Sequence, residues 1–90
     1  MKFKTKTILT GVLSSLLRKI DTIENWFNSR KYQLAFAGVN EVETNLKIRV
    51  YPLISHIEKD RKLISEEKTA LSYIQSHLKK FKEKLNRIRL

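Results

Sequence analysis

The chain has 90 residues, of which 41% are hydrophobic and 31% charged, and its formal net charge at pH 7 is +10. This length allows a single domain over 1–90 with a small core. Two glycines and one proline are too few for a turn-rich all-β architecture, and the lack of cysteine excludes disulfides, thiolate metal sites and a cysteine nucleophile. The positive charge favours acidic partners: nucleic acid, an anionic membrane surface or an acidic protein surface.

Most of the excess of positive charge lies at the two ends of the chain. Three lysines precede residue 7, whereas residues 7–77 are nearly balanced, with ten basic and eight acidic side chains. From residue 78 onward, six basic residues stand against one acid, Glu83. The six form the candidate basic patch: Lys79, Lys80, Lys82, Lys84, Arg87 and Arg89.

The start of the chain imitates a secretion signal, with a basic segment followed by an apolar run over 7–17. No small-x-small cleavage site follows, and the apolar spacing continues past Arg18 and Lys19. We therefore expect a cytoplasmic protein without an N-terminal signal. No run in the sequence is long enough to cross a bilayer as a helix.

Residues 7–28 are predicted to form a helix. Apolar residues recur there in steps of four and three, which places them on one stripe of a helix. Asn28 and Ser29 are poor residues for a helix interior and good terminators. The stripe consists of Leu9, Leu13, Leu16, Ile20, Ile23 and Phe27.

Residues 32–51 fit two patterns. The alternation of apolar and other side chains over 32–36 and 46–51 is typical of a β-hairpin, but a lone hairpin is marginal without packing. A helical stripe accounts for more residues, so we favour a helix, and the capping-box spacing of Asn40 and Glu43 allows it to break and restart at 38–40. The stripe consists of Tyr32, Ala35, Phe36, Val39, Val42, Leu46 and Val50.

Pro52 is expected to start a further helix, because proline donates no backbone hydrogen bond and restrains the residue before it away from the helical region. From Ile57 onward, apolar residues repeat every seven positions, as in a coiled-coil seam. The second heptad position is polar at Asp60 and Glu67, which weakens the seam. The last helix is therefore either long or broken near 62–65, where a serine and two glutamates could cap a separate helix.

No catalytic, cofactor or metal site is predicted. His56 and His77 lie 21 residues apart, without the i, i+4 spacing of a helical metal pair. The acidic pairs at 41/43 and 66/67 do not face each other on a helix, so we expect solvated or capping charges. No glycine-rich phosphate loop, nucleophile elbow or metal signature occurs. We expect no enzyme activity, no cofactor and no small-molecule substrate.

The C-terminal helix offers the candidate partner-binding surface. Its apolar seam is narrow, and the basic patch covers most of the remaining circumference. Three interpretations fit the periodicity equally well: a solvated helix whose seam packs internally, an electrostatic footprint for phosphates, and a basic amphipathic helix that meets a membrane or a groove in a partner. The seam consists of Leu71, Ile74, Leu78, Phe81, Leu85 and Ile88.

Together these patterns predict an all-α fold, either a three-helix bundle or a helical hairpin with a long C-terminal heptad helix. The alternative is an α-β-β-α arrangement with a central hairpin. The predicted function is a non-catalytic interaction module that binds another macromolecule, a protein or a second copy of the chain, through an apolar helix face flanked by basic residues. Because three narrow stripes are hard to hide in ninety residues, we expect a dimer or an obligate hetero-complex.

Two other functions stay open. The first is a nucleic-acid-binding protein that uses the basic C-terminal helix. The second is a membrane-surface or bacteriocin-immunity-type protein: in length, charge and expected helix count, the chain resembles the small cytosolic immunity proteins that protect bacteriocin producers. This resemblance lies in gross features and in no diagnostic residue, so it implies no site residues. The same features fit phage-encoded regulators and helical helper proteins of secretion systems.

Overall fold

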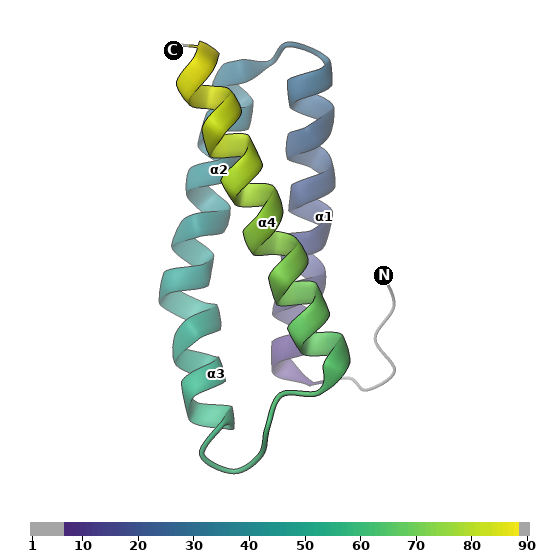
Figure 1. The fold of residues 1–90 in the computed structure, drawn as a ribbon, viewed down its shortest axis with the longest axis vertical. Coiled ribbons are helices and arrows are strands. Elements are labelled where there is room, and N and C mark those ends of the chain that lie inside the picture. The colour runs from purple at the N-terminus through teal and green to yellow at the C-terminus, as the bar shows by residue number, and fades with distance from the viewer. Residues whose placement is uncertain (1–6, 89–90) are drawn as a thin grey trace.

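The computed structural model describes residues 7–88 of the chain. They form α1 (Ile8–Asn28), α2 (Tyr32–Asn45), the π-helical segment η1 (Leu46–Val50), α3 (Tyr51–Ile57) and α4 (Ser65–Ile88). The backbone stays in the right-handed helical region from α2 through η1 into α3, so these three elements form one rod, which we call the middle helix. Figure 1 shows α1 running up, the middle helix running down and α4 returning across both.

The all-α prediction is confirmed as a three-helix bundle, and no strand occurs within residues 7–88. The alternative of a central hairpin is wrong. On a helix, Ala35, Val39, Val42, Leu46 and Val50 all share the buried side of the middle helix. In extended strands, odd and even positions would point to opposite faces, so the same residues would be divided between core and solvent.

The ends of α1 are fixed by local hydrogen bonds. At the start, the backbone N–H of Thr10 donates to Thr7 Oγ1 (3.1 Å), and the Thr7 N–H donates to Thr10 Oγ1 (2.7 Å). At the end, Arg30 adopts a positive φ of 59°, and the N–H of Lys31 reaches back to the carbonyl of Trp26 (2.7 Å). This is a Schellman stop, which turns the chain into α2 within three residues. The helix predicted over 7–28 is confirmed.

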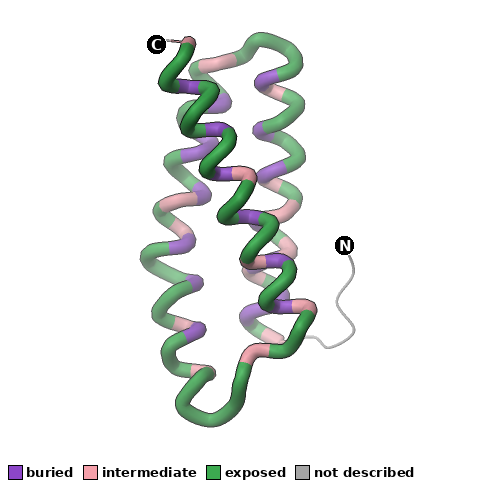
Figure 2. The backbone as a smooth tube through the Cα atoms, viewed as in Figure 1, coloured by how far each residue is buried: buried purple, intermediate pink, exposed green. Residues whose placement is uncertain are grey.

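The core runs along the axis of the bundle, where the three helices face one another. Figure 2 shows the buried positions on the inner side of each rod and exposed positions outside. The stripe expected on α1 is buried over its whole length, and Phe27 stacks on Phe81 of α4 with ring centroids 5.2 Å apart. The three apolar stripes therefore cover one another within one chain. The narrowness of the stripes, which led us to expect a dimer, no longer requires a second copy, and self-association stays a prediction.

Gly38 lets α1 and the middle helix approach closely. A Cβ atom at this position would lie 2.8 Å from Cγ1 of Ile23 and 2.9 Å from Cζ3 of Trp26. The glycine is buried against α1 inside an unbroken helix. The break that the capping-box spacing allowed at 38–40 does not occur, and the glycine that weakens the helix locally is the residue that allows the two helices to pack closely.

The middle helix passes through Pro52 without stopping. Pro52 stands in the first turn of α3, as expected, but Tyr51 keeps helical angles (φ −64°, ψ −43°), so the expected extended conformation is wrong. Just before the proline, the N–H of Tyr51 donates to the carbonyl of Leu46, five residues back. Such a widened turn accommodates a proline, whose ring would otherwise clash with a carbonyl of the preceding turn.

A loop separates α3, which ends at Ile57, from α4, which begins at Ser65. Of the two expectations for the last helix, the one with a break near 62–65 is therefore confirmed. The loop returns the chain and delivers Arg61 to Glu67 in the first turn of α4. Glu67 is fully buried, and its carboxylate also accepts the backbone N–H of Ile64 (3.0 Å). A glutamate at this position satisfies a free donor at the start of the helix, as in half of a capping box.

Candidate functional site

The C-terminal seam lies inside the bundle and does not form an exposed surface. Four of its six members have less than 10% of their surface exposed, and the other two are half-buried and packed against the core. The prediction that this seam is an exposed partner-binding face is therefore corrected, because its side chains fill the space between α1 and the middle helix. The buried four are Ile74, Leu78, Phe81 and Leu85, and the half-buried two are Leu71 and Ile88.

The candidate basic patch is divided between two sides of α4. Arg89 lies outside the described residues, and the other five side chains are exposed. Lys82 faces the middle helix and pairs with Glu43, whereas Lys84 lies over the ring of Phe27 on α1, 5.5 Å from its centroid. The exposed five are Lys79, Lys80, Lys82, Lys84 and Arg87.

Four of the seven large apolar side chains that are exposed among the described residues lie on the middle helix, which the sequence patterns did not predict. Leu34 and Phe36 are each about half exposed, Ile48 is 68% exposed and Tyr51 is 42% exposed. Phe36 was counted in the buried stripe, but it lies at the edge of the helix face. The signal that could have found Ile48 is the alternation over 46–50, which places Lys47 and Arg49 beside it.

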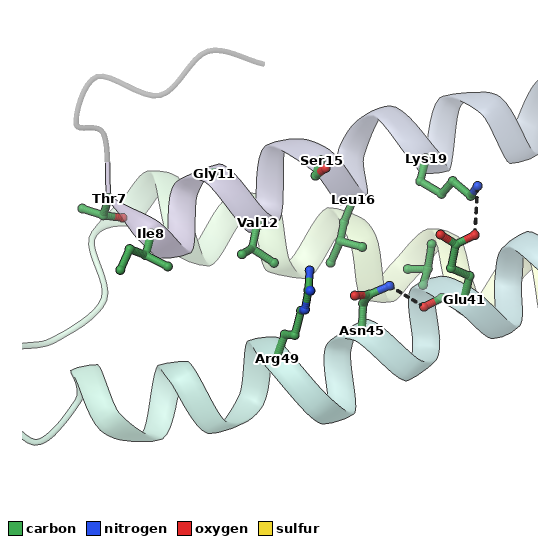
Figure 3. Close-up of a pocket in the computed structure, with 11 residues that line it drawn as sticks. Thr7, Ile8, Gly11, Val12, Ser15, Leu16, Lys19, Glu41, Asn45 and Arg49 are labelled. Carbon is green, nitrogen blue, oxygen red and sulfur yellow. Dashed lines mark hydrogen bonds and ion pairs between the residues drawn. The ribbon is translucent and has the colours of Figure 1, made fainter.

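One groove lies between α1 and the middle helix, with a volume of about 480 Å³, and we call it the α1 groove. Figure 3 shows Arg49 extending from the middle helix toward α1. Lys19 pairs with Glu41 across this groove at 2.9 Å, and Asn45 Nδ2 donates to the carbonyl of Glu41, also at 2.9 Å. Lys19 and Arg49 exceed the single carboxylate of this groove by one charge.

A second groove, also of about 480 Å³, lies between the middle helix and α4, and we call it the α4 groove. Two lysines from different helices flank Glu43: Lys47 Nζ lies 3.5 Å from Oε1, and Lys82 Nζ contacts Oε2. The hydrogen bond from Lys82 lowers the pKa of Glu43, with burial opposing, and the charges of both lysines lower it further. The groove is lined by Glu43, Leu46, Lys47, Tyr51, Gln75, Leu78, Lys79 and Lys82.

The two histidines lie apart. His56 is exposed near the end of α3, while His77 stacks on Tyr73 with ring centroids 4.0 Å apart, and its Nδ1 lies 2.9 Å from the Tyr73 carbonyl oxygen. Within residues 7–88, no three side chains of His, Cys, Asp or Glu come together in a way that could hold a metal ion. No helix in this part of the chain has the length and hydropathy needed to cross a membrane.

Comparison with known proteins identifies no relative: no protein-family model, curated protein or solved structure matches the chain. A function like that of the bacteriocin immunity proteins, which the chain resembles in length, charge and helix count, stays a prediction. The features of the bundle that bear on function are the exposed apolar side chains of the middle helix and the two charged grooves beside it.

Proposed function

We propose that the chain is a non-catalytic interaction module that binds an acidic protein surface through the middle helix. The observation that supports this most directly is the exposure of Ile48, at 68%, between Lys47 and Arg49. A single exposed isoleucine is ordinary on a protein surface. Here, however, the middle helix carries four exposed large apolar side chains, while α1 and α4 carry one each among the described residues.

The local backbone adds a second reason. Ile48 lies in the middle of η1, and widened π-helical turns occur frequently at functional sites. The flanking cations point to opposite sides, since Arg49 lines the α1 groove and Lys47 lines the α4 groove. A partner that covers Ile48 with apolar atoms and meets both cations with carboxylates would gain affinity from the former and orientation from the latter.

Nucleic acid is a weaker alternative for this surface. Phosphate contacts supply affinity without any need for an exposed aliphatic anchor. The basic side chains of α4 are divided between two sides of that helix, since Lys82 faces the middle helix and Lys84 faces α1, so they do not lie along one face. The binding of an acidic protein accounts for both the apolar and the basic part of the surface on the middle helix.

The test compares two exposed isoleucines. The tagged chain and the variants Ile48→Ala and Ile8→Ala are used to capture partners from extract of the source cell, and the retained material is identified as protein, nucleic acid or lipid. We expect a retained protein whose dissociation constant rises about tenfold or more for Ile48→Ala, because an anchor side chain contributes about 1–2 kcal/mol or more. Ile8, 76% exposed at the start of α1, serves as the matched control and should leave the constant unchanged.

Two results would contradict the proposal. One is a retained protein that Ile48→Ala and the unchanged chain bind equally well. The other is retained material that nuclease removes completely, with a salt dependence typical of phosphate contacts, because it would assign the surface to nucleic acid instead.

A further inference from the structure

The α4 groove contains more positive charge than its own carboxylate can neutralise. Three lysines line it, Lys47 from η1 and Lys79 and Lys82 from α4, against the single acid Glu43. Two positive charges are therefore uncompensated inside one groove of about 480 Å³. In the α1 groove, by comparison, the excess is a single charge.

Glu43 is the partner of two of the three lysines in this groove. Only 28% of its side chain is exposed, and its two oxygens pair with the ammonium groups of Lys47 and Lys82, whose side chains are 70% and 52% exposed. Because the neighbouring lysines lower the pKa of Glu43, its carboxylate is ionised at neutral pH.

Two buried apolar side chains and one hydrogen bond form the remaining sides of the groove. Leu46 and Leu78 form an apolar floor and are almost completely buried. At one end, Gln75 Nε2 donates to the hydroxyl oxygen of Tyr51 (3.1 Å), which links α4 to the middle helix. A volume of this size lies within the range of ligand sites and is ample for a phosphate group.

From these observations we infer that the α4 groove is a binding site for a phosphate monoester dianion, with Glu43 as the internal anion that competes with the ligand for Lys47 and Lys82. A dianion would bring the charge of the groove to neutrality, which a single carboxylate would not. Phosphate carries between one and a half and two negative charges at about pH 7, and lysine is a common phosphate ligand that acts as a point charge. This inference goes beyond protein binding at Ile48, and the two can fail separately.

The experiment is a titration of the full-length chain with inorganic phosphate at constant ionic strength, followed by amide chemical shifts. We expect saturable shifts concentrated at 43–51 and 75–82. Lys79→Gln should weaken binding about three- to tenfold, as for the loss of one charge-assisted contact. Lys80→Gln is the matched control, since it removes the same charge from the adjacent position, which does not line the groove.

Glu43→Gln tests the competing carboxylate, and Glu83→Gln, which removes an exposed carboxylate of α4 that does not line the groove, measures the effect of the added positive charge alone, so the first variant should tighten binding more than the second. Removing the competing carboxylate should tighten phosphate binding severalfold, whereas a merely structural role of Glu43 would weaken it. Ile48→Ala should leave phosphate affinity unchanged, because the two proposals share Lys47 but the phosphate site does not use the apolar anchor.

The proposal would be overturned by shifts scattered over all lysines, by equal weakening in Lys79→Gln and Lys80→Gln, or by weaker binding in Glu43→Gln with the helical circular dichroism intact. An oligonucleotide that binds far more tightly than phosphate, and is equally sensitive to Lys80→Gln, would also overturn it in favour of a phosphodiester surface along α4.

Discussion

At the scale of single residues, the most constrained charge in the bundle is Glu67. Both terminal nitrogens of Arg61 donate to its carboxylate, at 2.9 and 3.0 Å, and its side chain is fully buried. The hydrogen bond from Arg61 lowers the pKa of Glu67, although burial alone would raise it. A carboxyl whose pKa is lower in the folded state stabilises the fold above its unfolded pKa, about 4.3, and this contribution is lost as pH falls through the folded pKa.

Glu67→Gln should therefore destabilise the bundle at neutral pH and matter less in acid. We expect a loss of about 1–3 kcal/mol at pH 7, below the value for a fully buried pair because the Arg61 side chain is 38% exposed and partly screened. Urea unfolding from pH 7 to pH 2 measures it, and the difference between the two proteins should shrink below pH 4.

Glu24→Gln is the control for this measurement, since it removes one exposed carboxylate from α1 and should change stability by less than about 0.5 kcal/mol. A difference between Glu67→Gln and the unchanged chain that stays constant down to pH 2 would show that the charge of Glu67 does not stabilise the fold.

At the scale of helices, the two glycines make opposite predictions. Gly11 is exposed on α1 with nothing within 4 Å of an added Cβ, whereas a Cβ at Gly38 would meet Ile23 and Trp26 below 3 Å. Gly11→Ala should stabilise the protein by about 0.5–1 kcal/mol, because alanine loses less backbone freedom in a helix. Gly38→Ala should destabilise it by about 1–3 kcal/mol, because the two helices must move apart. Thermal unfolding of both variants compares them, and a stabilised Gly38→Ala would disprove the close contact.

The helical character of the chain and the buried faces of α1 and α4 were predictable from the sequence, because periodicity shows which residues share one side of a helix. The π-helical turn was not, since it depends on how the register of the middle helix meets Pro52. The exposure of Phe36 was also missed, because a stripe does not show where its edge lies. For the candidate surface, periodicity identified the seam of α4 but could not tell whether α1 and the middle helix would cover it. Which apolar side chains of the middle helix stay exposed depends on how the three helices pack, and periodicity alone does not give that packing.

At the scale of the whole molecule, the bundle is 44 Å long and only 22 by 16 Å across, with 19 basic against 9 acidic side chains in the sequence. Like charges are therefore held close together along a thin rod. The ion pairs that oppose this repulsion include Lys19–Glu41 and the two pairs of Glu43, each with exposed members. Such surface pairs contribute about 0.2–1 kcal/mol each and are themselves weakened by salt.

Repulsion among the excess cations should outweigh those pairs, so we expect sodium chloride to stabilise the fold. Between 10 and 100 mM salt, the screening length falls from about 30 Å to about 10 Å, which is less than the length of the bundle. Relief of about 1 kcal/mol would raise Tm by about 4–8 °C in a domain of this size. Differential scanning calorimetry in a buffer without phosphate measures the shift.

A variant with Lys68, Lys80 and Arg87 changed to glutamine, which removes three exposed cations outside the α4 groove, should start from a higher Tm at low salt and gain less from added salt. A Tm that falls with salt in the unchanged chain would mean that the few ion pairs, and not the net charge, dominate the electrostatic energy of the bundle.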